Sequence, residues 1–299
     1  MPSEAYGDTG LSGQANPLTS PLPRIRNVPA DIARSWLLVP ATQPETFDAA
    51  LTSRADAVVL DIEDAVDPSH KSSARHDVLS WLHRGGRAWV RINDVSSEFW
   101  AEDVAELRNT PGLLGVMLAK TESAEQVKET YHRLDGNTKV LALVESAVGI
   151  EEANNIARAE GVFRLAFGSG DFRRDTGMSA DREAMAYPRA KLVVASRVGN
   201  LPGPIDGPTV GTNHPVLREQ SAVTVSMGMT GKLCLQADQA TVINEVISPA
   251  PSDVAWATDF MADFDARGGV IRDGSDLPRL GRAQKIMKLA VAFGVQPAS

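Results

Sequence analysis

The sequence is poor in cysteine, in long apolar runs and in positive charge, and each shortage excludes a class of protein. Cys234 is the only cysteine in 299 residues, which excludes an internal disulfide framework and a multi-cysteine metal cluster. No stretch approaches the roughly 18 consecutive apolar residues of a membrane span. Lys and Arg total 30 against 38 Asp and Glu, and this net charge of −8 argues against binding to nucleic-acid phosphates.

The start of the chain also lacks the features of a leader. MPSEAYGDTG has no basic and no apolar stretch, so we expect no signal peptide and a cytoplasmic location. The first 33 residues hold several prolines and glycines and almost no apolar periodicity, which predicts a disordered or loosely ordered tail. An arm that docks on a partner subunit is the alternative for this segment.

From residue 34 onward, short apolar runs alternate with amphipathic stretches. Runs of this kind are typical of strands buried on both faces of a parallel sheet, and the stretches between them favour helices. The alternation predicts an α/β fold. The runs lie at 35–40, 55–61, 87–92, 115–120, 139–145, 162–168, around 204–206 and at 231–235, and helices are expected at 69–83, after the capping box of Ser123 and Gln126, at 151–160, 181–198, 252–267 and 280–293.

The length that remains after the tail selects among α/β folds. About 265 residues are close to the roughly 250 of a (β/α)8 TIM barrel. We therefore predict a tail at 1–33, a TIM-barrel catalytic domain at 34–245, and a C-terminal helical extension at 246–299 that contributes to the oligomer and to an active-site lid. An open doubly wound sheet is the alternative from periodicity alone, although no G-x-G-x-x-G follows the first strand.

Charged residues recur where the apolar runs end. The carboxyl ends of barrel strands form one rim, where the active sites of such barrels lie, so we expect these residues to converge. The alternative is that charges follow strands only because strands end at the surface. The residues are Glu63, Asp64, Arg91, Lys120, Glu145 and Asp171.

Glu145 and Asp171 have no histidine or cysteine near them in the sequence. Zinc would require such ligands, whereas Mg²⁺ binds through one or two carboxylates and completes its shell with water and substrate oxygens. A metal with an arginine beside it stabilises negative charge that develops on oxygen. The pattern therefore favours Mg²⁺-dependent chemistry that forms an enolate or cleaves a carbon–carbon bond next to a carbonyl.

These motifs, taken in order, resemble the citrate lyase beta-subunit-like family, which includes malyl-CoA lyases and HpcH/HpaI aldolases. Leu-Asp-x-Glu-Asp-Ala-Val, Val-Arg-Ile-Asn and the Glu145/Asp171 pair carry most of the resemblance. It spans roughly residues 34 to 294. The matching segments are 34–40, 57–66, 71–75, 90–93, 119–123, 143–147, 167–171, 231–232 and 248–249.

The resemblance implies a β/α barrel that assembles as a homotrimer or hexamer. It implies that Glu145 and Asp171 are the Mg²⁺ ligands and that Arg91 holds a substrate carbonyl or carboxylate and steadies enolate charge. Glu63 and Asp64 match acidic residues that border the metal site and act through water or on Arg91.

Other residues match with less specific surroundings. Asp276 resembles an aspartate that reaches a neighbouring subunit's site and handles the proton on the enolate carbon. Lys71 and Arg75, one helical turn apart, are expected to meet CoA phosphates, and a solvated basic face is the alternative. Lys120 is expected to bind substrate.

The implied reaction is reversible cleavage of a β-hydroxyacyl-CoA of the citryl-, malyl- or citramalyl-CoA type into an α-keto acid and an acyl-CoA. An aldolase acting on free keto acids, a variant that hydrolyses the thioester after condensation, and a weakly catalytic barrel that binds a metabolite are the alternatives. The chain departs from the family pattern at Ala41, at Ala119 and after Lys232, where the usual His-Pro is missing. Changes at the first and eighth strand ends would reshape the rim where a long substrate enters.

Overall fold

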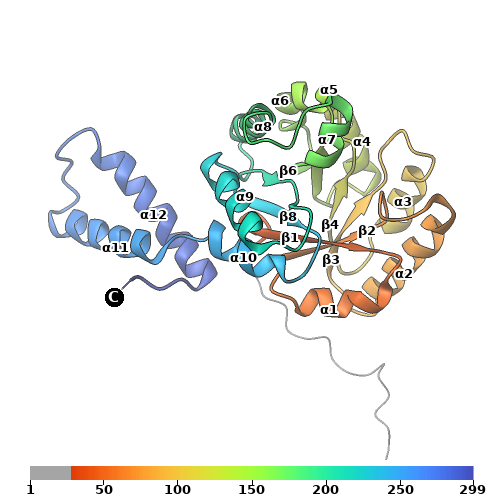
Figure 1. Ribbon diagram of the computed structural model, residues 1–299, viewed down its shortest axis with the longest axis horizontal. Helices are drawn as coiled ribbons and strands as arrows, with labels where there is room; N and C mark the ends of the chain where they lie inside the picture. The colour runs from red at the N-terminus through yellow and green to blue at the C-terminus, as the bar shows by residue number, and fades with distance from the viewer. Residues whose placement is uncertain (1–27, 299) are drawn as a thin grey trace, which may run out of the picture.

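The expected (β/α)8 barrel is confirmed. The protein was examined as a computed structural model, which describes residues 28–298. Its strands are all parallel and follow one another around a closed barrel in chain order, with β1 paired to both β2 and β8 (Figure 1). The strands are β1 (Ser35–Pro40), β2 (Ala57–Asp61), β3 (Ala88–Ile92), β4 (Leu113–Leu118), β5 (Val140–Val144), β6 (Val162–Phe167), β7 (Ile205–Asp206) and β8 (Gly231–Cys234).

Helices surround the barrel, and the expected capping box is present at the start of α4. The single helix expected at 151–160 is instead two short helices, α5 and α6. The surrounding helices are α1 (Phe47–Thr52), α2 (Lys71–His83), α3 (Trp100–Leu107), α4 (Ala124–Arg133), α5 (Ala147–Glu151), α6 (Ala153–Ile156), α7 (Ser169–Thr176), α8 (Ala186–Val198), α9 (His214–Ser226) and α10 (Gln239–Ile247), with 3₁₀ turns at Pro44–Thr46 and Pro68–His70.

Each barrel strand is buried on both faces, which explains the near-continuous apolar runs of the sequence. Alternate side chains point into the barrel, among them Val59 and Trp89, while their neighbours Leu60 and Val90 pack against the surrounding helices. The rings of Trp36 and Trp89 meet edge to face inside the barrel, with their centroids 5.2 Å apart. This interior packing makes the barrel a filled core with room for chemistry only at its ends.

The amino-terminal end of the barrel is closed around Arg164, whose side chain points inward from β6 and is fully buried. Its guanidinium donates to the carbonyls of Gly203, Ala30 and Ala33 and to the hydroxyl of Thr230. Residues 28–33 therefore contribute to the barrel floor, while residues 1–27, where most of the expected tail falls, lie outside the described residues.

Replacing Arg164 with methionine is expected to lower the free energy of unfolding by about 3 kcal/mol or more, because buried acceptors would lose a charged donor. Denaturant unfolding of both proteins measures the difference. Arg158→Met provides the control, because Arg158 is an exposed arginine. A change in unfolding free energy no larger than that of the Arg158→Met control would contradict the role given to Arg164.

Two long helices follow the barrel, α11 (Pro251–Ala266) and α12 (Asp276–Phe293), and they pack against each other through Ala257, Phe260 and Ala283. Figure 1 shows this hairpin extending away from the barrel, with the turn between the two helices at its far end. The boundary expected near residue 245 stays a prediction. Within residues 28–298, no helix combines the length and the apolar character needed to cross a membrane.

Candidate active site

The carboxyl ends of β2 to β6 bring six of the expected residues to one end of the barrel. Arg91 lies within β3, and the others follow their strands directly or, for Asp171, sit in the first turn of α7. The convergence depends on the parallel register alone, because consecutive strands pair side by side around the barrel. The residues are Glu63, Asp64, Arg91, Lys120, Glu145 and Asp171.

Arg91 is held by a carboxylate that the sequence analysis did not single out. Asp61 pairs with Arg91 in the register of β2 and β3, and both side chains share the inward direction of Val59 and Trp89 two residues earlier. The Nε and Nη2 of Arg91 donate to the two oxygens of Asp61 at 2.8 and 2.5 Å. The alternation of inward and outward side chains along β2 and β3 could have predicted this pair from the sequence.

The charge of Arg91 is secured by its surroundings. Burial alone would lower the pKa of Arg91, but the charge and hydrogen bonds of Asp61, followed by the charge of Glu63, outweigh it and raise that pKa. Nη1 of Arg91 lies 3.2 Å from Oε2 of Glu63. The result is a permanently charged, oriented guanidinium at the mouth of the barrel.

Glu63 links Arg91 to Lys120, so one carboxylate orients two cations. Nζ of Lys120 forms ion pairs with Glu63 and, at 3.1 Å, with Oδ1 of Asp64. Burial works against the charge of Lys120, yet its bonds to Glu63 raise its pKa. The side chain of Lys120 is 34% exposed, so of the two cations it is the one that reaches solvent.

Glu145 and Asp171 line a shared cavity of about 390 Å³ with Lys120, Arg174 and Asp175 among their neighbours. Glu145 is 3% exposed, and its Oε1 accepts a hydrogen bond from the backbone N–H of Lys120 at 2.7 Å. A Cβ at Gly168 would lie 2.2 Å from Oε2 of Glu145, so only glycine allows this close approach.

The electrostatics around Glu145 favour a cation. Burial, together with the nearby charges of Asp171 and Glu63, raises the pKa of Glu145 to about 8, although the Lys120 N–H and the charge of Arg91 act to lower it. Within residues 28–298, no three His, Cys, Asp or Glu side chains are grouped as a metal-binding set. A pair of carboxylates fits Mg²⁺, because this ion fills most of its coordination shell with water and substrate oxygens.

Lys71 and Arg75 are not on an exposed basic face, which corrects the alternative considered for them. Lys71 is buried, and its Nζ donates to the carbonyls of Ile62 and Glu63 and to Oδ1 of Asn93. Arg75 is buried against Asp103, with 2.8 Å between Nη1 and Oδ1. The expected contact with CoA phosphates gains no support, and Lys71 instead supports the loop that carries Glu63.

Asp276 is the one expected catalytic residue that does not join the cluster. It is the first residue of α12, at the far end of the helical hairpin. There its carboxylate accepts hydrogen bonds from Nη1 of Arg267 at 2.6 Å and from the backbone N–H of Arg272 at 2.7 Å. These bonds, the one from Arg267 first, lower the pKa of Asp276 to about 2.

Comparison with known proteins agrees with this geometry. Human citramalyl-CoA lyase, a mitochondrial protein, is 29% identical over 87% of this chain and 86% of its own length. The L-malyl-CoA/beta-methylmalyl-CoA lyase of Cereibacter sphaeroides is 27% identical over 88% of this chain and 96% of its own.

Solved structures lead to the same group. Protein CitE of Mycobacterium tuberculosis, in complex with magnesium, acetoacetate and coenzyme A, superposes with a TM-score of 0.73 at 27% identity, over 87% of this chain and 99% of its own. The model of the HpcH/HpaI aldolase/citrate lyase family matches residues 34–237, and that of the HpcH/HpaI aldolase C-terminal domain matches residues 252–294. Because the two models together cover the barrel and the helical hairpin, the chain belongs to the HpcH/HpaI aldolase/citrate lyase family.

Proposed function

We propose that this protein is a Mg²⁺-dependent carbon–carbon lyase. It would cleave a β-hydroxyacyl-CoA into an α-keto acid and an acyl-CoA, or form the β-hydroxyacyl-CoA from them. The observation that carries the proposal is the buried Glu145, which shares a cavity with Asp171 and feels the charge of Arg91. Relatives named as citramalyl-CoA and malyl-CoA lyases support the same reaction class.

Glu145 and Asp171 would hold the Mg²⁺ ion. When bound, the ion would supply a Lewis acid for the oxygens of the keto acid. The protein's part is to keep Glu145 away from bulk water and to fix one of its oxygens through the N–H of Lys120. This fixed geometry lowers the reorganisation needed at the moment of reaction.

Arg91 would stabilise the thioester enolate. Breaking the carbon–carbon bond leaves its electron pair on the acyl-CoA fragment, where the charge moves onto the thioester oxygen. A guanidinium already oriented by Asp61 and Glu63 can donate to that oxygen without first being ordered. Lys120 is half-buried beside it and is placed to contact a carboxylate of the substrate.

The proton balance requires a further group. In cleavage the β-hydroxyl loses a proton and the enolate carbon gains one, and in condensation the acyl-CoA carbon loses a proton. We assign this carbon end to the carboxylate of Asp276 of a second copy, which its low pKa keeps ionised and ready to act as the base in condensation. The hairpin holds Asp276 away from its own barrel and exposes Val270, Ile271 and Leu277 around it, as a segment buried in a partner would. The proposed assembly is a homotrimer or hexamer, and the cytoplasmic location stays a prediction.

Mixing Asp276→Ala protomers with Arg91→Ala protomers is expected to restore part of the activity that each variant lacks. Some sites in a mixed oligomer would combine an intact Arg91 with an intact Asp276 from a neighbour. Turnover measured after co-refolding, against each variant alone, checks this. Mixed oligomers with no activity above that of the single variants would assign Asp276 to its own chain or to no catalytic role.

The reaction class is tested with a panel of β-hydroxyacyl-CoA thioesters and of acyl-CoA and keto-acid pairs, each with Mg²⁺, followed by mass spectrometry. Formation of a keto acid plus acyl-CoA, or the reverse, supports the proposal. Turnover of free hydroxy acids alone would support the aldolase alternative, and release of free CoA would support the hydrolysing variant. Binding without turnover across the panel would support the metabolite-binding barrel.

A further inference from the structure

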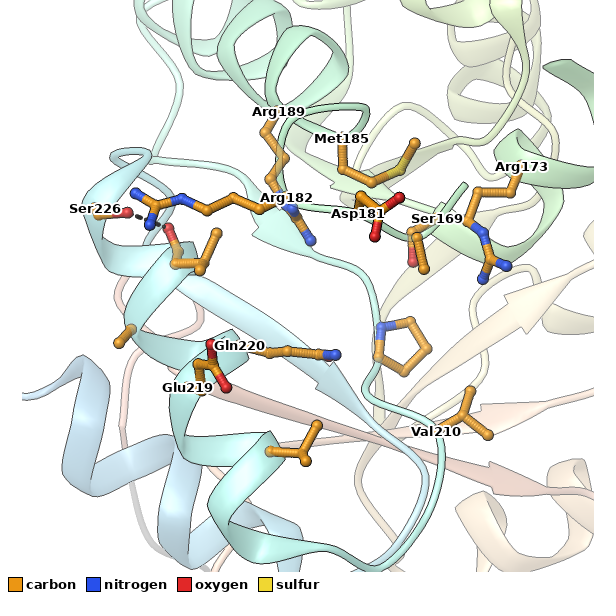
Figure 2. Close-up of a pocket in the computed structure, with 15 residues that line it drawn as sticks. Ser169, Arg173, Asp181, Arg182, Met185, Arg189, Val210, Glu219, Gln220 and Ser226 are labelled. Atoms are coloured by element: carbon orange, nitrogen blue, oxygen red, sulfur yellow. Dashed lines mark hydrogen bonds between the residues drawn. The ribbon is translucent and has the colours of Figure 1, made fainter. Parts of the chain in front are cut away.

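A second cavity, of about 640 Å³, opens between α7, α8 and α9, next to the candidate active site. Figure 2 shows Arg173 and Arg189 on the side of α7 and α8, Glu219 and Gln220 on α9 across from them, and Arg182 reaching over toward Ser226 of α9. The volume is within the roughly 300–1,000 Å³ of small-molecule sites. Neither the metal ligands nor Arg91 line this cavity.

Arg189 is fixed in place by a fully buried carboxylate. Its Nε donates to Oδ1 of Asp206 at 2.9 Å, and its side chain is 11% exposed. Asp206 also accepts from Thr224 and lies 3.7 Å from Nζ of Lys232. Asp206 thus fixes the orientation of Arg189, which lines the cavity.

Arg173 and Arg182 add two more guanidinium groups to the lining of the cavity. Among residues 28–298, no carboxylate oxygen lies within 4 Å of the nitrogens of either side chain, and both side chains are exposed. Of the two lining carboxylates, Asp181 is already bonded by the hydroxyl of Ser179, and Glu219 lies on the opposite wall. Among the described residues, Arg173 and Arg182 therefore keep guanidinium groups that have no ion-pair partner.

The cavity is a neighbour of the metal site and shares a helix with it. Ser169 and Arg173 of α7 line this second cavity. Asp171, Arg174 and Asp175 of the same helix line the cavity of Glu145. A ligand bound by Arg173 would thus contact the helix that carries Asp171.

We propose that this cavity binds a phosphate-bearing ligand of nucleotide size, with its phosphoryl oxygens on Arg189, Arg182 and Arg173. Guanidinium groups bind phosphate through paired N–H donors, and Arg189 is held ready for this by Asp206. Glu219 and Gln220 face the other end of the ligand, where they can accept from amino or hydroxyl groups. The AMP titration below does not depend on the proposed function, and only the kinetic comparison that follows it rests on that function.

Calorimetric titration of the full chain with AMP, in EDTA so that no metal takes part, tests the site. Wild-type protein is expected to bind AMP saturably, and Arg182→Ala and Arg173→Ala should each weaken binding about tenfold or more. Both side chains are exposed, so neither substitution endangers the fold. Arg197→Ala is the matched control, because Arg197 is also exposed on α8 but does not line the cavity. Asp171→Asn should bind AMP as the wild type does.

Absence of saturable AMP binding by the wild type, or equal weakening by Arg197→Ala, would overturn the proposal. Two sources could supply the phosphate, a free nucleotide or the nucleotide end of a CoA thioester, and kinetics separate them. A KM for the thioester that rises with Arg182→Ala assigns the phosphate to the substrate. AMP binding that falls while this KM stays the same assigns it to a free nucleotide.

Discussion

Replacing Glu145 with glutamine is expected to abolish Mg²⁺ binding and to lower turnover about a thousandfold or more, because several kcal/mol of transition-state stabilisation would be lost with the ion. Glutamine keeps the size of the side chain and the oxygen that accepts from the Lys120 N–H. Asp171→Asn should behave in the same way. Calorimetry with MgCl₂ and turnover at saturating Mg²⁺ measure both effects.

Asp175 provides the matched control for these variants. It lines the same cavity, and its carboxylate accepts from the backbone N–H of Ala147. Asp175→Asn should therefore keep Mg²⁺ binding. If Glu145→Gln or Asp171→Asn keeps the wild-type affinity for Mg²⁺, that residue is not a ligand.

Replacing Glu145 with glutamine is also expected to change the stability of the protein in a way that depends on pH. Burial raises the pKa of Glu145 to about 8, above its usual 4.5. The neutral form is therefore favoured in the folded state, and its contribution to stability is full below pH 4.5 and is lost as the pH rises through 8. In EDTA, the Tm advantage of Glu145→Gln over wild type should grow between pH 5 and 8, and Mg²⁺ should raise the Tm of wild type only.

Substituting lysine for Arg91 is expected to lower kcat about 100- to 1,000-fold, the range found when an oxyanion donor is removed. An ammonium group has no planar fork, so it cannot hold both oxygens of Asp61 and still donate to an enolate. Mg²⁺ affinity should stay near the wild-type value, since Arg91 is not a ligand. Steady-state kinetics and Mg²⁺ titration of the variant measure the two effects separately.

Arg34 offers a control with the same chemistry at the opposite end of the barrel. It pairs with Asp56 through Nε and Nη2 at 2.7 and 2.8 Å, and the two residues come directly before β1 and β2, at the barrel floor. Arg34→Lys should cost stability but leave the kcat of the folded protein unchanged. An equal loss of kcat in both variants would mean that Arg91 acts through the fold and not on the substrate.

The strands were predictable because each is buried on both faces, so apolar residues run without interruption between polar ends. Helix α9 was not predicted, and its buried face explains why. That face carries Leu217, Ser221 and Thr224, so two of its three buried positions are filled by hydroxyl side chains. Without an apolar stripe, helical periodicity could not be recognised in the sequence.

The site was predictable where it depends on strand ends. Glu145 and Asp171 are 26 positions apart, yet β5 and β6 are neighbours, so chain order in a parallel barrel was enough to bring them to one rim. Asp61 could have been found from strand alternation, since it follows the inward-facing Val59 by two residues.

The sequence by itself determined the barrel, the rim and the residues that end each strand, because these follow from local apolar patterns repeated along the chain. Only the tertiary structure decided what each charged side chain meets. Lys71 and Arg75 turned inward because their acceptors, Asn93 and Asp103, lie on segments more than 20 residues away. The energy of a buried charge depends on such distant partners, and no local pattern in the sequence records them.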